Sequence, residues 1–125
     1  MILVDTSVWV DHLRRRDSLL SERLATAQVL VHPFVIGEIA LGHLRQRWLV
    51  LSMLQGLPRA TVATEREVMD FIDRYALFGF GIGYVDAHLL AAVRLSAAAG
   101  LWTRDKRLRE AARQLNLAAD PPDVD

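Results

Sequence analysis

The stretch ILVDTSVWVDHL, residues 2–13, joins a short apolar run to a helical pattern. Residues 2–5 predict a buried strand, because a run this short and rich in β-branched residues ends at an acid. Residues 7–15 predict a helix, with Val8, Trp9 and Leu13 at helical spacing. A strand followed at once by a helix is typical of a protein in which helices cover a parallel sheet.

The rest of the chain repeats this alternation. Three further short apolar runs predict strands at residues 29–31, 60–63 and 101–103. Helical patterns lie between them, with a proline at 33 suited to a first turn and a Thr64-x-x-Glu67 capping box. The predicted helices span residues 7–15, 17–27, 33–45, 46–56, 64–77, 84–99 and 105–116. The pattern indicates an α/β domain with a parallel sheet covered on both faces.

Composition excludes several classes of protein. A length of 125 residues fits one domain, and an apolar fraction of 52% excludes intrinsic disorder. The absence of cysteine excludes disulfides and cysteine-bound metals. No apolar run reaches the roughly 18 residues of a membrane span, and the first residues do not resemble a signal peptide. We therefore expect a cytoplasmic protein without a membrane segment, ending in a loose acidic tail over residues 118–125.

Four acids stand in unusual surroundings. Asp5 and Asp105 follow predicted strands, at the edge where sites form in parallel sheets. Glu38 and Asp86 have mostly apolar neighbours at helical spacing, where an unpaired charge is costly. Taken singly, Asp5 or Asp105 could be a helix N-cap, and Glu38 or Asp86 could pair with a buried arginine. Most other acids, such as Asp11 four residues before Arg15, are expected on the solvated surface.

Together the four acids favour a metal site. Clustered carboxylates repel one another unless cations neutralise them, and hard oxygen ligands select Mg²⁺ or Mn²⁺. Such a site suits the hydrolysis of phosphodiesters, because the metal activates water and stabilises the leaving oxygen. A net charge of zero argues against a general polyanion-binding module but not against an enzyme with an acidic site.

The acid-bearing motifs resemble those of the PIN-domain ribonucleases, and among them the VapC toxins of bacterial toxin–antitoxin pairs. The acids are 33, 48 and 19 residues apart, and the resemblance extends from residue 1 to about 117. Each motif is weak alone, but their order is specific. The motifs are Asp5-Thr6-Ser7, Glu38 within HPFVIGEIALG, Asp86 within GYVDAHLLAA, and Thr103-Arg104-Asp105.

The resemblance implies a fold and an activity. The fold would be a PIN-like three-layer α/β/α sandwich over residues 1–125, with a central parallel sheet of four to five strands. The activity would be Mg²⁺- or Mn²⁺-dependent endoribonucleolytic cleavage of RNA, by a toxin that forms a homodimer and is neutralised by a cognate antitoxin. Asp5, Glu38, Asp86 and Asp105 would hold the metal or its waters. Thr6, Ser7 and Thr103 would be supporting hydroxyls that orient them.

Other features have plainer interpretations. Arg104 and Lys106 flank Asp105 and are candidate RNA contacts. Residues 47–55 form an almost uniformly apolar helix, which could be core, dimer interface or antitoxin contact. The glycine-rich segment 79–83 lacks phosphate-loop spacing and is expected to be a connector. The four histidines lack zinc-site spacing and are expected to be structural or exposed.

Three alternatives compete with a ribonuclease. A receiver-type signalling domain would need adjacent acids after the first strand, where Thr6 and Ser7 stand. A haloacid-dehalogenase-like phosphatase would need a second acid at position 7. A catalytically inert PIN-fold binding module remains open, although all four acids are intact.

Overall fold

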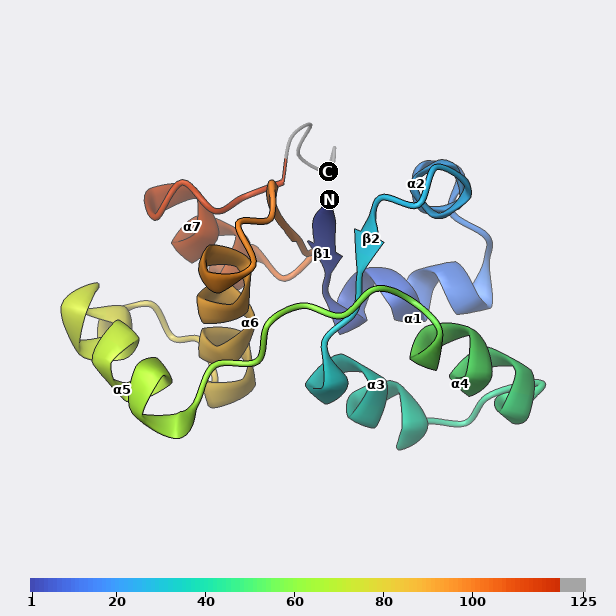
Figure 1. The fold of residues 1–125 in the computed structure, drawn as a ribbon, viewed down its shortest axis with the longest axis horizontal. Coiled ribbons are helices and arrows are strands. Elements are labelled where there is room, and N and C mark those ends of the chain that lie inside the picture. Colours follow the sequence, from blue (N-terminus) through green and yellow to red (C-terminus); the bar gives the residue numbers. More distant parts are fainter. Residues whose placement is uncertain (120–125) are drawn as a thin grey trace.

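The computed structural model describes residues 1–119, which form a three-stranded parallel sheet with helices on both sides of the strands (Figure 1). The strands are β1 (Ile2–Val4), β2 (Val29–Leu30) and β3 (Gly100–Trp102). The helices are α1 (Thr6–Arg14), α2 (Ser18–Ala25), α3 (Pro33–Ala40), α4 (Arg47–Gln55), α5 (Glu65–Arg74), α6 (Tyr84–Leu95) and α7 (Lys106–Gln114). A single 3-10 turn, η1 (Leu77–Gly79), precedes α6.

The opening stretch of the chain lies at the centre of the sheet. The strand order is β2-β1-β3, and Leu3 is in register with both Leu30 and Leu101. All three residues of β1 are buried, as are Val8 and Trp9 on the helix that follows. Full burial of one such side chain contributes about 1.5–3 kcal/mol to folding. The N-terminal segment therefore anchors the core, as its pattern predicts.

The prediction of four to five strands is wrong, because the described residues form only three. Residues 60–63 were expected to pair as a strand, but a single bridge between Val31 and Arg59 marks that edge. The neighbouring strand β2 has only two residues, and Pro33 begins α3 soon after it. Within the run, the Ala60 N–H still donates to the Val31 carbonyl at 2.9 Å, but the Thr61 N–H donates to Ser96 Oγ at 2.8 Å, so the pairing does not continue as a strand.

The opposite edge of the sheet is closed by the end of the described chain. Leu101 bridges Ala118, and the Ala119 N–H donates to the Leu101 carbonyl at 2.9 Å. A Cβ on Gly100 would lie 2.5 Å from the Ala118 carbonyl carbon, so only glycine permits this approach. Residues 118 and 119 of the expected loose tail thus pair with β3. The remainder of that tail, 120–125, lies outside the described residues.

Two helices end earlier than their apolar patterns suggest. The predicted helix 33–45 ends at Ala40, and α4 starts only after Gln46, whose φ of 51° is left-handed. The predicted helix 84–99 ends at Leu95, and Ala97 has a φ of 50°. Ala97 interrupts the second of these helices, because a left-handed backbone cannot continue the right-handed hydrogen-bond ladder. By contrast, the capping box between Thr64 and Glu67 is present as predicted.

The apolar helix α4 divides into a buried and an exposed face. Leu54 is fully buried, and Val50 and Leu51 pack partly against the core. Trp48 is 80% exposed, and Leu49 and Met53 are also exposed. The core interpretation therefore holds for one face only, and the exposed face remains available for a contact. Among the described residues, no helix has the length and apolarity needed to cross a membrane.

Candidate active site

Asp5 is fixed where β1 passes into α1. Its backbone N–H continues the sheet by donating to the Trp102 carbonyl at 2.9 Å, and its side chain caps α1. Asp5 Oδ2 accepts hydrogen bonds from Ser7 Oγ at 2.7 Å and Thr103 Oγ1 at 2.8 Å. The residue is only 6% exposed. The N-cap interpretation is therefore correct for Asp5, but the cap uses only one oxygen of its carboxylate.

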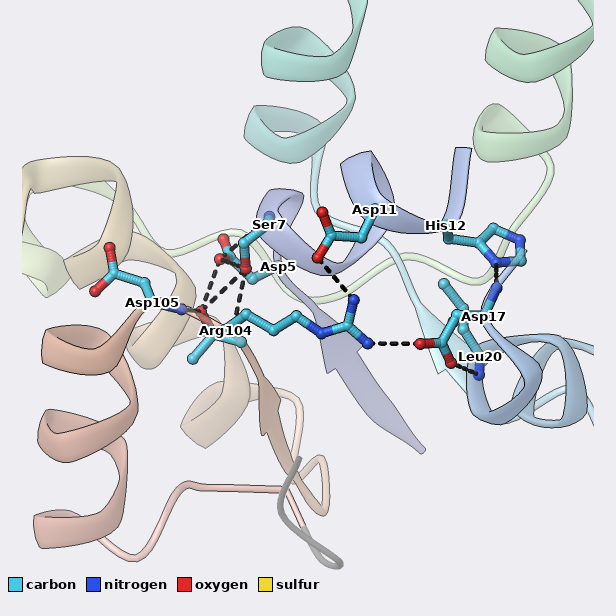
Figure 2. A network of polar contacts seen from close by, with 9 residues as sticks. Asp5, Ser7, Asp11, His12, Asp17, Leu20, Arg104 and Asp105 are labelled. Carbon is cyan, nitrogen blue, oxygen red and sulfur yellow. Dashed lines mark hydrogen bonds and ion pairs between the residues drawn. The ribbon is translucent and has the colours of Figure 1, made fainter. Parts of the chain in front are cut away.

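The two hydroxyls around Asp5 join the ends of β1 and β3. Ser7 Oγ accepts from the Arg104 N–H at 3.0 Å, and Thr103 Oγ1 accepts from the Asp105 N–H at 3.1 Å (Figure 2). The bonds from Arg104 to Ser7 and from Thr103 to Asp5 connect residues 97 and 98 apart in sequence. Asp5 Oδ1 accepts no hydrogen bond from residues 1–119. The supporting hydroxyls predicted at positions 7 and 103 thus orient Asp5 and leave one of its oxygens available.

Glu38 does not lie on a buried helix face, contrary to expectation. The side chain is exposed, and its Oε1 accepts a hydrogen bond from Thr6 Oγ1 at 2.6 Å. The expectation placed Leu41 beside it, but α3 ends at Ala40 and Leu41 is 90% exposed. The third predicted hydroxyl, Thr6, therefore orients Glu38 across the contact between α1 and α3.

Asp86 is partly buried in the first turn of α6, and its pKa is raised. Burial is the largest cause of the increase, and the charges of Asp5, Asp105 and Glu38 raise the pKa further. A hydrogen bond from the Gly83 N–H, at 3.1 Å from Asp86 Oδ2, opposes these effects. Asp86 therefore lies within electrostatic reach of all three other candidate acids.

Asp105 lies at the start of α7 and is exposed. Its Oδ1 caps the helix by accepting from the Leu108 N–H at 3.0 Å, so the N-cap interpretation is correct here too. Its Oδ2 accepts no hydrogen bond from the part of the chain that the structure describes. The carbonyl-end edge of the sheet thus brings together four carboxylates from the starts of α1, α6 and α7 and from within α3.

The chemistry of this donor set fits a hard divalent cation. It offers carboxylate and hydroxyl oxygens, and neither ion pair found among residues 1–119 involves any of the four acids. Burial, and then the charges of the other three acids, raise the pKa of Asp86, and a cation would relieve this repulsion. In the described chain, however, no three His, Asp or Glu side chains are grouped to hold a metal ion. Three of the acids are instead held by hydrogen bonds from Thr6, Gly83 and Leu108.

Arg104, a candidate RNA contact, is engaged within the protein. Its guanidinium pairs with Asp11 at 2.8 Å and with Asp17 at 2.6 Å (Figure 2). Asp11 was expected to pair with Arg15 on its own helix, and this expectation is wrong because Arg104 reaches it from the end of β3. Lys106 is exposed beside Asp105. The RNA-contact role remains a prediction for both residues.

Two histidines near the site are structural. His32 is fully buried at the end of β2, and its Nδ1 accepts from the Phe34 N–H at 3.0 Å. Burial, and then the nearby His88, lower the pKa of His32 to about 4. His88 is 5% exposed, and burial lowers its pKa as well. Both rings are buried, as expected of structural histidines.

A groove opens beside Glu38 between α1, α3 and the segment that leads to α4. Its volume is about 820 Å³. The lining combines apolar side chains with the basic residues Arg14 and Arg45. The apolar members are Val10, Leu13, Ile39, Leu44 and Val50. No motif in the sequence signals this groove, because its walls come from separate helices.

The chain is similar to known proteins over most of its length. Residues 2–114 match the family model described as PIN domain. The Mycobacterium tuberculosis protein Ribonuclease VapC32, from strains CDC 1551 / Oshkosh and ATCC 25618 / H37Rv, is 48% identical over 118 residues. That alignment covers 94% of this chain and 95% of the relative.

A solved structure has a similar fold. The crystal structure of PAE2754 from Pyrobaculum aerophilum superimposes with a TM-score of 0.59 at 17% sequence identity. The match covers 90% of this chain and 79% of that one. At this identity the likeness concerns the fold alone.

Proposed function

This chain belongs to the PIN-domain family, and on that premise we propose that it is a Mg²⁺- or Mn²⁺-dependent endoribonuclease, the toxin of a toxin–antitoxin pair. The observation that carries the proposal is the group of four acids that take part in neither ion pair found among residues 1–119. Repulsion within this group, added to burial, raises the pKa of Asp86. A relative that is a VapC ribonuclease by name supports RNA as the substrate.

In this proposal Asp5, Glu38, Asp86 and Asp105 hold the metal, directly or through water. The bound metal supplies activation of water and stabilisation of charge on the phosphate. Ser7 and Thr103 hold Oδ2 of Asp5, so its Oδ1 is presented in a fixed direction. Thr6 does the same for Glu38 through its 2.6 Å hydrogen bond. Preorganised ligands of this kind avoid reorganisation during the reaction.

The carboxylates of Glu38, Asp86 and Asp105 each accept a hydrogen bond from their own surroundings. We propose that these side chains reorient when the metal binds. The alternative function, a PIN fold kept only for binding, is favoured by the absence of a ready group of three metal ligands in residues 1–119. The cleavage experiment below distinguishes these two functions.

The proposed partners are a cognate antitoxin and a second copy of the chain. The apolar and basic groove beside Glu38 supports the first, because an antitoxin segment bound there would contact Glu38. The exposed face of α4, with Trp48 80% exposed, supports a protein contact of one of these two kinds.

The test is RNA cleavage by purified wild type, Asp5→Asn and Asp70→Asn, with and without EDTA. Asp70 is an exposed acid on α5 and serves as the matched control. We expect internal cleavage by wild type and Asp70→Asn that EDTA abolishes, and a large loss in Asp5→Asn. Cleavage that survives EDTA, or that is equal in all three proteins, contradicts the metal mechanism. Absence of cleavage in wild type favours the binding module.

A further inference from the structure

Four aromatic rings pack in a row between the start of α3 and the start of α6. The ring centroids of His32 and Phe34 are 4.9 Å apart, and the Phe34 and Tyr84 rings both lie 4.7 Å from the ring of His88. All three contacts are edge-to-face, with interplanar angles from 61° to 86°, an arrangement that the ring quadrupoles favour. The contact between Phe34 and His88 is the one that joins the two helices.

Each helix fixes its own rings. His32 is fully buried and caps α3, since its Nδ1 accepts from the Phe34 N–H at 3.0 Å, so the capping imidazole also packs against Phe34. On α6, Tyr84 and His88 are four residues apart and therefore lie on the same helix face. His32 Nε2 and His88 Nδ1 are buried without a hydrogen-bond partner in residues 1–119. The two imidazoles thus contribute packing, not hydrogen bonds, to the contact between the helices.

These rings lie beside two of the candidate metal ligands. Phe34 is one helical turn before Glu38 on α3, and Asp86 lies between Tyr84 and His88 on α6. No hydrogen bond or ion pair found within the described chain joins α3 to α6. The relative position of Glu38 and Asp86 therefore depends on packing between the helices, in which Phe34 and His88 take part.

We propose that Phe34 and His88 are positioning residues, whose contact sets the separation of Glu38 and Asp86 so that both carboxylates can hold one divalent metal ion. The inference rests on the proposed function and adds residues that act through the acids. Loss of a group that orients metal ligands costs about 10- to 100-fold in metal affinity. Because the His88 ring acts here by its shape, a phenyl ring can replace it.

Calorimetric titration of Mn²⁺ into variants of the two rings tests this role. His88→Ala and Phe34→Ala should each weaken Mn²⁺ binding about tenfold or more, because the ring contact between the helices is lost. His88→Phe should bind Mn²⁺ like wild type, because it keeps a ring at the contact. The double variant should bind no more weakly than either single variant, because both changes remove the same contact. Should His88→Ala fail to fold, the less buried Phe34→Ala gives the same test.

Phe71→Leu is the matched control. Phe71 on α5 is 8% exposed, and Arg94 of α6 lies over its ring, so it too is an aromatic contact to α6. Its loss should lower the melting temperature, as His88→Ala does, without changing the affinity for Mn²⁺. An equal fall in Mn²⁺ affinity in Phe71→Leu and His88→Ala would assign the effect to general destabilisation and contradict the positioning role.

A distance measured without metal separates this inference from the proposed function. The chain has no cysteine, so spin labels attach only at cysteines introduced at exposed positions, Gly37→Cys on α3 and Leu95→Cys on α6. A Cβ at Gly37 would meet nothing outside its own helix within 4 Å. In this labelled background His88→Ala should shift or broaden the distribution of distances between the labels, measured by pulsed electron paramagnetic resonance. His88→Phe should restore the original distribution.

Specific outcomes overturn the inference. Unchanged Mn²⁺ affinity in His88→Ala and Phe34→Ala contradicts it and leaves the proposed function intact, because wild type then still binds the metal. An unchanged label distance in His88→Ala contradicts it whether or not wild type binds Mn²⁺. Failure of His88→Phe to restore Mn²⁺ affinity would mean that the imidazole itself is required, which also contradicts it. Failure of the proposed function is recognised separately, by wild type that neither binds Mn²⁺ nor cleaves RNA.

Discussion

The protein contains two groups of carboxylates, and they differ in whether an arginine pairs with them. Asp11 and Asp17 share the guanidinium of Arg104, which reaches them from the end of β3 (Figure 2). The four acids at the carbonyl-end edge of the sheet have hydroxyl and backbone N–H partners but take part in neither of these ion pairs. The first group shares one positive charge within the protein, whereas the second takes part in neither ion pair found among residues 1–119.

The pKa directions express this difference. Burial favours the neutral form of Asp17, but the Leu20 N–H and the Arg104 guanidinium outweigh it, so its pKa is lowered. Burial also favours the neutral form of Asp86, but there the neighbouring charges act in the same direction and its pKa is raised. Arginine therefore marks the first group as structural. The four acids of the second group take part in neither ion pair found among residues 1–119, which makes them the candidate metal ligands.

The largest expected effect is on catalysis. Asp86→Asn should lower the rate of RNA cleavage about 10²–10³-fold, because losing one contact to transition-state charge costs several kcal/mol. Asp11→Asn should change the rate less than about threefold, because that carboxylate pairs with Arg104 and is not one of the four candidate metal ligands. Single-turnover cleavage of one RNA by both variants checks the prediction. Equal losses in both would remove the distinction between the groups.

The second effect is on stability. Arg104→Ala should lower the free energy of unfolding by about 1–2 kcal/mol, because it leaves the partly buried Asp17 unpaired, while the more exposed Asp11 adds little. Lys106→Ala, at an exposed position nearby, should change it by less than about 0.5 kcal/mol. Urea denaturation at pH 7 provides the measurement. If Arg104→Ala left the free energy of unfolding unchanged, the ion pairs of Arg104 with Asp11 and Asp17 would contribute nothing to stability.

The smallest effect is the pH dependence of stability, which should have opposite signs in the two groups. The folded pKa of Asp86 is raised, so its ionisation destabilises the protein once the pH exceeds the unfolded value near 4. Without metal, Asp86→Asn should therefore stabilise the protein at pH 7, by up to about 1 kcal/mol, and not at pH 3.

The folded pKa of Asp17 is lowered, so its contribution is present above the unfolded value and is lost as the pH falls through the folded one. Asp17→Asn should destabilise the protein at pH 7 and have little effect at the lowest pH. Melting temperatures between pH 3 and 7 compare the two variants. If Asp86→Asn and Asp17→Asn changed the melting temperature in the same direction at pH 7, the comparison of the two groups would be contradicted.

The sequence predicts the three paired strands better than the segments that flank them. β1, β2 and β3 appear as short apolar runs, and the helices between them carry clear periodicity. The run at 60–63 does not form a strand, because pairing at this edge continues only as far as the Ala60 N–H, which donates to the Val31 carbonyl. The end of α6 at Leu95 was missed because alanine, the residue type of left-handed Ala97, does not signal a helix end.

The candidate site shows the same division. Strand-end position and family motif indicate Asp5, Asp86 and Asp105, but the exposure of Glu38 could not be read from its apolar neighbours. The pairing of Arg104 with Asp11 and Asp17 was missed because the partners are 93 and 87 residues apart. Local spacing carries no signal for such contacts, since only the folded sheet brings their segments together.

The central claim is that the acids without an arginine partner bind a divalent metal and the paired ones do not. Calorimetric titration of Mn²⁺ into wild type, Asp86→Asn and Asp17→Asn tests this directly. The account predicts saturable binding by wild type and by Asp17→Asn, with affinity reduced at least tenfold in Asp86→Asn. Binding that is absent from wild type, or equal in all three proteins, would contradict it.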